Sequence, residues 1–325
     1  MRASILMAAA LLPIQATPSG APVPRLVQPI ACEVGRDCLI QKLPDADPGP
    51  GRADHRCGRM TTDGHDGVDF RPRGDDVVAR GVAVLAAADG TVIRARDGEP
   101  DRSVFERGST GGRDAGNGVV IGHGGGWETQ YSHLRQGSVR VRPGRRLRAG
   151  EPIGAVGLSG VTEYPHLHFS VRRAGVKIDP FTGLSLTTRC GAAGATMWDA
   201  RAAAALAYRP AALIGMGFGS RVAGSARPTP ASVDGVLAPD RPLILWAEVA
   251  GAEPRDLQRF LITGPDGAVV LDRKVPVASG GLVWFAFAGA RAPSSGWRRA
   301  RYHGRYELIR AARPLVSGAA SAELR

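Results

Sequence analysis

Two histidines one residue apart, His166 and His168, are placed to do chemistry together. Successive side chains of an extended strand point to opposite faces, so both imidazoles would share one face. Leu167 and Phe169 would then anchor the other face. Such a pair can hold a metal ion or a water bound to one. Two surface histidines on an amphipathic strand would look the same, so the pair alone leaves both interpretations open.

A second polar group, His65 and Asp69, lies far earlier in the chain within a glycine-rich segment. Four fully extended residues span roughly 13 Å, so the two side chains can share an ion only if the chain folds back. With one histidine of the later pair they would supply three ligands of mixed nitrogen and oxygen type. Three protein ligands and one open position are typical of catalytic zinc. We favour this interpretation over unrelated surface polar groups.

The segments that must position these residues have the pattern of a β domain. The 44 glycines and 24 prolines favour a turn-rich, mainly β protein. Between residues 65 and 180, short β-type runs alternate with glycine-containing turns. The clearest runs are 82–88, 90–96, 118–122, 128–133, 152–156 and 166–172. His133 ends one of them and by itself would be an ordinary histidine. The charged insert 98–116 has no apolar period and is predicted to be a mobile surface loop.

Beyond this region the pattern predicts a short connector helix and then a second β unit. Residues 197–208 (MWDARAAAALAY) form the one plausible helix. Strand-like runs at 213–219, 243–250, 259–263, 268–271, 282–288 and 304–309 then suggest a β-sandwich. Trp246, Trp284 and Phe285 are predicted to lie in its core. No catalytic constellation is found in this unit.

The N-terminus and the cysteines indicate export. Arg2 precedes a short apolar run of signal-peptide length, and residues 1–21 are predicted to be a signal peptide. No later segment is long and apolar enough to cross a membrane. In an oxidising compartment the four cysteines would form disulfides. We prefer the pairs Cys32–Cys38 and Cys57–Cys190 over the two other pairings.

The net charge of the chain excludes few classes of binding partner. The formal net charge is +12, spread along the chain, with a sequence pI of about 10.5. A diffuse basic balance suits any polyanion, including an anionic cell envelope. No nucleic-acid recognition motif and no basic stripe with interleaved aromatics is present, so a specific nucleic-acid partner is not expected.

Three spaced motifs in order make the sequence similar to the lysostaphin-type (LytM-like) zinc metallopeptidases, which cleave peptide bonds in peptidoglycan. The motifs are His65-x-x-x-Asp69, Tyr131-x-His133-Leu134 and His166-x-His168-Phe169, within a similar region of roughly residues 60–182. The resemblance implies an antiparallel β domain with a groove, of the barrel-sandwich hybrid kind. It also implies that His65, Asp69 and His168 hold Zn²⁺.

The resemblance further implies that His133 and His166 flank the reacting water. No glutamate general base of the His-Glu-x-x-His kind is present. These two histidines are therefore assigned to orienting or deprotonating the water and stabilising the oxyanion, without division of the roles. Asp179 is a candidate partner for a ligand or, alternatively, a turn residue before Pro180. Asp66, His123 and His55 are predicted not to be ligands.

The expected organisation is a signal peptide (1–21), an N-terminal extension (22–59), a zinc peptidase domain (60–190), a connector (191–209) and a β-sandwich domain (210–325). The expected function is a periplasmic or secreted endopeptidase that hydrolyses peptidoglycan stem-peptide cross-links. The alternative is a non-catalytic peptidoglycan-binding regulator or amidase activator. A biotin- or lipoyl-carrier hammerhead is disfavoured because no lysine lies at a hairpin tip.

Overall fold

The computed structural model of the protein describes residues 22–74, 76–222, 233–234 and 237–325. The predicted signal peptide, residues 1–21, lies outside the described residues. Antiparallel strands dominate the regular structure, and the expected mainly antiparallel β fold is confirmed. Within the described part of the chain, no helix has both the length and the apolar character needed to cross a membrane.

The largest sheet holds eight strands from the first half of the chain. Its order is β1-β2-β9-β6-β5-β4-β7, with β10 also paired to β9, while β3 and β8 form a separate pair. Each strand-like run predicted between residues 82 and 172 overlaps one of these strands. The strands are β1 (Cys38–Lys42), β2 (Val68–Pro72), β3 (Ala83–Leu85), β4 (Gly90–Arg96), β5 (Asn117–Gly122), β6 (Trp127–Leu134), β7 (Arg146–Leu147), β8 (Pro152–Ala155), β9 (Leu167–Arg173) and β10 (Val176–Ile178).

Strand β9 shows why this sheet orients its polar side chains as it does. Leu167, Phe169 and Val171 alternate along the strand and are all buried in the main core. Because side chains alternate in a strand, the residues between them must point to the opposite face. His168 is therefore directed away from the core by the apolar residues on either side of it.

Among the described residues, three short helices accompany the strands. They are α1 (Val77–Arg80), α2 (Val104–Arg107) and α3 (Ala200–Ala205). Helix α3 lies inside the predicted helix 197–208 but is shorter, because the Asp199 side chain accepts the Ala202 N–H and caps its start. Helix α2 is a four-residue helix inside the predicted surface loop 98–116. The carboxylate of Asp101 ties this insert to the backbone N–H groups of Gln136 and Leu158.

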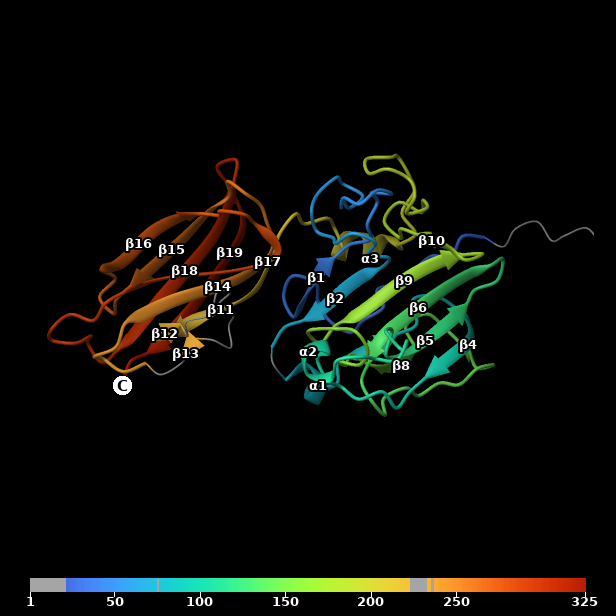
Figure 1. The fold of residues 1–325 in the computed structure, drawn as a ribbon, viewed down its shortest axis with the longest axis horizontal. Coiled ribbons are helices and arrows are strands. Elements are labelled where there is room, and N and C mark those ends of the chain that lie inside the picture. The colour runs from blue at the N-terminus through green and yellow to red at the C-terminus, as the bar shows by residue number, and fades with distance from the viewer. Residues whose placement is uncertain (1–21, 75, 223–232, 235–236) are drawn as a thin grey trace, which may run out of the picture.

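The second half of the chain forms two packed sheets. One has the order β11-β14-β17 and the other β16-β15-β18-β19, beside a small β12-β13 pair. One apolar cluster joins the inner faces of both sheets. Figure 1 shows them as a separate body beside the eight-stranded sheet. The strands are β11 (Ala212–Gly219), β12 (Arg221–Val222), β13 (Val233–Asp234), β14 (Leu243–Ala252), β15 (Leu257–Thr263), β16 (Val269–Pro276), β17 (Gly281–Ala290), β18 (Arg301–Arg310) and β19 (Arg313–Glu323).

The core prediction for the aromatic residues of this sandwich is correct only for Trp284. Trp284 packs against the apolar cluster between the sheets, whereas Trp246 and Phe285 are absent from that cluster. Trp284 and Phe285 are neighbours on β17, and adjacent side chains of a strand cannot face the same core. Trp246 alternates on β14 with the fully buried Leu245 and with Ala247, so it too faces outward.

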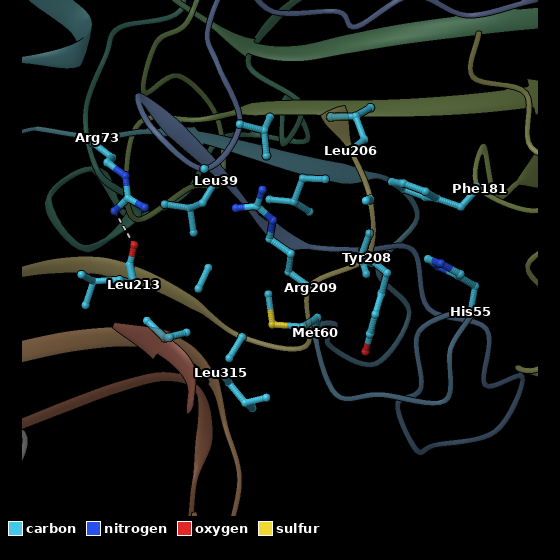
Figure 2. A pocket seen from close by; sticks show the side chains of 18 of the residues that line it. Leu39, His55, Met60, Arg73, Phe181, Leu206, Tyr208, Arg209, Leu213 and Leu315 are labelled. Atoms are coloured by element: carbon cyan, nitrogen blue, oxygen red, sulfur yellow. Dashed lines mark hydrogen bonds between the residues drawn. The ribbon is translucent and has the colours of Figure 1, made fainter. Parts of the chain in front are cut away.

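The two halves meet through an apolar junction. Leu39, Leu43 and Met60 from the first half are buried against Ile214 and Ala250 from the second. A crevice of about 200 Å³ lies beside this junction. Figure 2 shows it, with Tyr208 and Phe181 on its wall. Arg73 crosses the junction and donates to the backbone carbonyls of Leu213 and Ile214. Shared burial and these hydrogen bonds hold the halves together.

Both predicted disulfides are present. Cys32 pairs with Cys38, closing a short loop, and Cys57 pairs with Cys190, closing a long one. No free cysteine occurs among the described residues. The long loop contains every residue of the three sequence motifs, so this bond restricts the unfolded chain over the whole candidate site.

Replacing each disulfide by two serines tests how much it contributes. Loop-closure entropy predicts a loss in the free energy of unfolding of about 5 kcal/mol for Cys57–Cys190, and about 2 kcal/mol for Cys32–Cys38. The sequence separations are 133 and 6 residues. Urea denaturation of both variants measures the difference. Equal losses would show that the long loop is already restricted in the unfolded state.

Candidate metal centre

Strand pairing brings Asp69 and His168 together. Strands β2 and β9 are antiparallel neighbours, and their register sets Asp69 directly opposite His168. His168 Nδ1 lies 2.9 Å from Asp69 Oδ1. Asp69 is fully buried. The two central residues of the site are thus fixed by backbone hydrogen bonds within the largest sheet.

His65 joins them because the segment before β2 folds back. Gly64 adopts a left-handed backbone conformation with φ of 71°, and the Asp45 carboxylate accepts its N–H. His65 Nε2 consequently lies 3.3 Å from Asp69 Oδ1. One ligand atom from each of His65, Asp69 and His168 can be chosen so that all three lie within 4.8 Å of one another. The reversal that the sequence required therefore occurs.

Gly67 is needed for this close approach. A Cβ atom at this position would lie 2.6 Å from the Phe169 carbonyl oxygen and 2.7 Å from the His168 ring. Both distances are shorter than side chains tolerate. Any larger residue would push the segment that carries His65 and Asp69 away from β9.

The donor set fits a zinc ion. Two atoms in it, His65 Nε2 and Asp69 Oδ2, are buried and have no hydrogen-bond partner. Buried polar atoms without partners are costly, and a cation would satisfy both. Lys42 Nζ lies 3.5 Å from Asp69 Oδ2, and its positive charge offsets part of the cost of burying that oxygen. Two imidazoles and one carboxylate, with a cleft on the open side, are the ligand types of catalytic zinc.

Asp66 orients His168, a role that the sequence analysis missed. His168 Nε2 donates to Asp66 Oδ1 at 3.0 Å, which leaves Nδ1 beside Asp69. Lys177 Nζ holds the other Asp66 oxygen at 3.1 Å. The sequence analysis predicted only that Asp66 is not a ligand. The signal that could have found it is the rule that a metal-binding histidine donates its second N–H to a carboxylate.

The charges around His168 reinforce one another. Burial by itself would lower the pKa of His168, but its hydrogen bonds to Asp66 and Asp69 raise it to about 9. Burial would raise the pKa of Asp66, yet the hydrogen bond from His168 holds it well below its ordinary value. The pKa of Asp69 is also held low, against burial, by His65 and His166. Both carboxylates are therefore held in their charged form.

His133 and His166 lie on the cleft side of this group. Their ring centroids are 4.8 Å apart, and His166 Nε2 lies 3.5 Å from Asp69 Oδ1. His133 Nδ1 donates to the Ser159 carbonyl at 2.8 Å, and His166 Nδ1 donates to the Tyr164 carbonyl at 3.0 Å. In both rings Nδ1 is occupied by the backbone, so Nε2 is left for the cleft.

The backbone and burial of His133 set it apart. It is a non-glycine residue with φ of 62°, a conformation that clusters at functional sites. Burial and the neighbouring His166 and His168 lower the pKa of His133 well below its usual value. The neutral ring is therefore favoured, with its Nε2 lone pair free.

A cleft of about 650 Å³ opens over these five residues. This volume is in the range of clefts that bind substrate-sized ligands. Val104 from α2 and Val161 line it beside the histidines, and Leu282 and Val283 of β17 line it from the second half of the chain. The wall of the cleft is thus built from both halves.

Three other sequence candidates lie apart from the metal centre. Asp179 accepts the Phe181 N–H and faces His55 Nδ1 at 3.8 Å, so its interpretation as a turn residue is correct and the ligand-partner interpretation is wrong. His123 bonds Thr129 and the Asp89 carbonyl. Neither His55 nor His123 lines the cleft.

A buried carboxylate flanked by imidazoles on an antiparallel sheet is an arrangement suited to a catalytic metal, and comparison with known proteins agrees with it. Residues 63–180 match the model of peptidase family M23, so this region of the chain is similar to that family. The expected resemblance is confirmed. Roughly the first 60 residues and those after 180 lie outside the match.

Proteins named for different roles are similar to this region of the chain. The DD-carboxypeptidase/endopeptidase Mpg of Neisseria meningitidis is 39% identical over 95 residues, which cover 29% of this chain and 20% of the relative. The murein hydrolase activator EnvC of Escherichia coli is 35% identical over 98 residues, covering 30% and 22%. The crystallised catalytic domain of lysostaphin from Staphylococcus simulans is 25% identical at a TM-score of 0.27, covering 36% and 75%.

The match spans only about a fifth of the length of the curated relatives. Their identity therefore concerns the domain around the metal centre.

The pH dependence of stability tests the environment of Asp179. Burial raises the pKa of Asp179 to about 7. An acid whose pKa is raised on folding binds its proton more tightly when folded, so stability falls as pH rises from about 4 to about 7. Asp179→Asn keeps an acceptor for the Phe181 N–H but cannot ionise. Between pH 4 and pH 7, we expect the free energy of unfolding of Asp179→Asn to fall by about 3 to 4 kcal/mol less than that of the parent protein.

Urea denaturation at half-unit pH steps measures this difference. Asp63→Asn, at an exposed position, is the control. Parallel stability profiles for the parent protein and Asp179→Asn would contradict the assignment.

Proposed function

We propose that this protein is a zinc-dependent endopeptidase that hydrolyses peptide cross-links of peptidoglycan after export to the periplasm or beyond. The observation that carries the proposal is the convergence of His65, Asp69 and His168, with partnerless buried atoms, beneath a cleft flanked by His133 and His166. The similarity to the peptidoglycan DD-endopeptidase ShyA of Vibrio cholerae, 32% identical over 107 residues, supports the substrate class. The two disulfides are consistent with an oxidising compartment.

The roles of the residues follow from their contacts. Zinc, when bound by His65, Asp69 and His168, supplies a Lewis acid that lowers the pKa of a water ligand to about 7 and polarises the scissile carbonyl. His133 and His166 each present Nε2 to the cleft, because Nδ1 is held by a backbone carbonyl. They are suited to accept the proton of the attacking water and to donate a hydrogen bond to the oxyanion. Asp66 keeps His168 in the orientation that ligation needs.

The proposed organisation has a signal peptide (1–21), an N-terminal extension (22–59), a peptidase domain (60–190), a connector (191–209) and a β-sandwich domain (210–325). The shared cleft wall makes the sandwich part of the substrate environment. Stem peptides are the proposed partner, and no specific nucleic acid is expected.

One alternative has an observation in its favour. The similarity to EnvC, a murein hydrolase activator by name, is compatible with a non-catalytic regulator built on the same domain. All five predicted ligand and catalytic positions are nevertheless filled and brought together here. Activity measurements separate the two functions.

Histidine variants are expected to divide into two groups. His65→Ala and His168→Ala should lose bound zinc and activity together. His133→Ala and His166→Ala should retain zinc but lose at least 100-fold in the rate constant kcat, the usual contribution of a positioned proton-transfer group. Zinc content and mass spectrometry of peptides released from purified sacculi give the two readouts.

His123→Ala is the matched control, because His123 is a hydrogen-bonded histidine of the same domain outside the cleft. It should keep both zinc and activity. Release that is insensitive to chelator, or the absence of release from the zinc-loaded parent protein, would refute the proposal. The second outcome would favour the regulator.

Replacing Asp66 tests its positioning role. In Asp66→Asn, a neutral amide replaces the carboxylate that accepts the His168 N–H. Loss of such a carboxylate partner typically weakens metal affinity 10- to 100-fold. Chelator competition measures the affinity for zinc. Once saturated with zinc, this variant should recover most of its kcat, unlike His166→Ala. Unchanged zinc affinity would show that Asp66 serves only its ion pair with Lys177.

A further inference from the structure

Strand β17 carries apolar side chains on the face that is turned away from the sandwich core. Trp284, Ala286 and Ala288 contact the core between the sheets. The alternate residues Val283, Phe285 and Phe287 therefore lie on the outer face. Val283 and Phe287 are 41% and 42% exposed. The solvent face of an antiparallel sheet is usually polar, so an apolar outer face calls for an explanation.

Trp246 extends this face across the sheet. It lies opposite Phe287 in the register of β14 and β17. Its ring stacks beside that of Phe285, with centroids 5.9 Å apart and an interplanar angle of 23°. The centroids of Phe285 and Phe287 are 6.3 Å apart. We call Trp246, Val283, Phe285 and Phe287 the aromatic strip.

Glycines on the neighbouring strand let Trp246 lie over β11. A Cβ atom at Gly217 would lie 3.0 Å from the indole, and one at Gly215 would lie 3.6 Å from it. The indole therefore covers two positions without side chains. The nearly parallel Phe285 ring packs beside it, so the two rings form one apolar cluster on the outer face of the sheet.

The aromatic strip is continuous with the cleft. Val283, at one end of it, lines the cleft together with Leu282. Glu248, which pairs with Phe285 across the strands, lies 4.0 Å from Arg71 of β2. The Arg71 guanidinium in turn covers the ring of Tyr164, a cleft residue, at 4.4 Å. The outer face of the second half and the cleft of the first therefore share a wall.

We propose that the aromatic strip binds the glycan strand of the polymer whose stem peptide enters the cleft. This inference rests on the proposed function and adds a carbohydrate subsite to it. Pyranose rings present apolar C–H faces to which flat aromatic rings are complementary. From Val283 to Phe287 the strand runs about 13 Å, enough for more than one sugar ring. Continuity with the cleft favours the substrate polymer over an unrelated protein partner.

Binding of a soluble β-1,4-linked N-acetylglucosamine tetramer tests the subsite without hydrolysis. The variants are Phe287→Ala and the double variant Phe285→Ala/Phe287→Ala. The control is Val269→Ala, because Val269 is 65% exposed on β16 in the other sheet. Titration calorimetry should show Kd rising at least fivefold in Phe287→Ala and further in the double variant, with no change in the control.

Two further readouts locate the effect. Cosedimentation with purified sacculi should fall in the two strip variants. Hydrolysis of a short cross-linked peptide that carries no sugar should stay at the parent rate. If the double variant does not fold, as judged by its thermal transition, Phe287→Ala still decides, because the side chain it removes is exposed.

The outcomes separate this inference from the proposed function. Unchanged tetramer and sacculus binding in Phe287→Ala, or no binding by the parent protein, overturns the subsite even if the parent hydrolyses stem peptides. The subsite is also overturned if the strip variants keep sugar binding but no longer bind a protein that the parent binds. If the strip variants lose sugar binding while the parent hydrolyses nothing, the subsite stands and the peptidase proposal fails.

Discussion

The pairing of β2 with β9 is the constraint on which the rest of the site depends. It sets Asp69 against His168 through backbone hydrogen bonds, and apolar neighbours on both strands hold the two side chains on the cleft face. A slip of one residue would exchange the faces and place the imidazole in the core. The other functional residues are then added from loops and strand ends around this fixed pair. The ligand set is therefore as rigid as the centre of the sheet.

The sequence was sufficient for those parts of the fold that follow from local periodicity. Alternation of apolar residues predicted β9 and the order of strands along the chain, and it placed His166 and His168 near one another. Residue types favoured a site that joins one of these histidines to His65 and Asp69, and the resemblance to a known family specified His168. Local patterns contain no information about which distant strands become neighbours, and here β2 and β9 are far apart in sequence.

Other features could not be predicted because they depend on three-dimensional context. The partnership of Asp66 with His168 joins the loop before β2 to strand β9 and requires the observed ring orientation. Trp246 and Phe285 were expected in the core from their size, although alternation with Leu245 and Trp284 excludes this once the strands are fixed. The β17 side of the cleft depends on how two separately folded sheets meet. For these residues, the two-residue period of a strand predicts which side chains are buried better than residue type alone does.

The junction between the halves bears on how the chain can be divided. Leu39, Leu43 and Met60 are covered by Ile214 and Ala250, and Arg73 is hydrogen-bonded to the backbone of β11. Cutting the chain after the connector would expose this apolar surface to solvent. It would also leave the Arg73 guanidinium without its two backbone acceptors. A recombinant fragment ending there would need polar replacements at those three positions to remain monodisperse. The two β bodies are therefore not independent units. Moving either one onto another scaffold would require its half of the apolar junction to be moved with it.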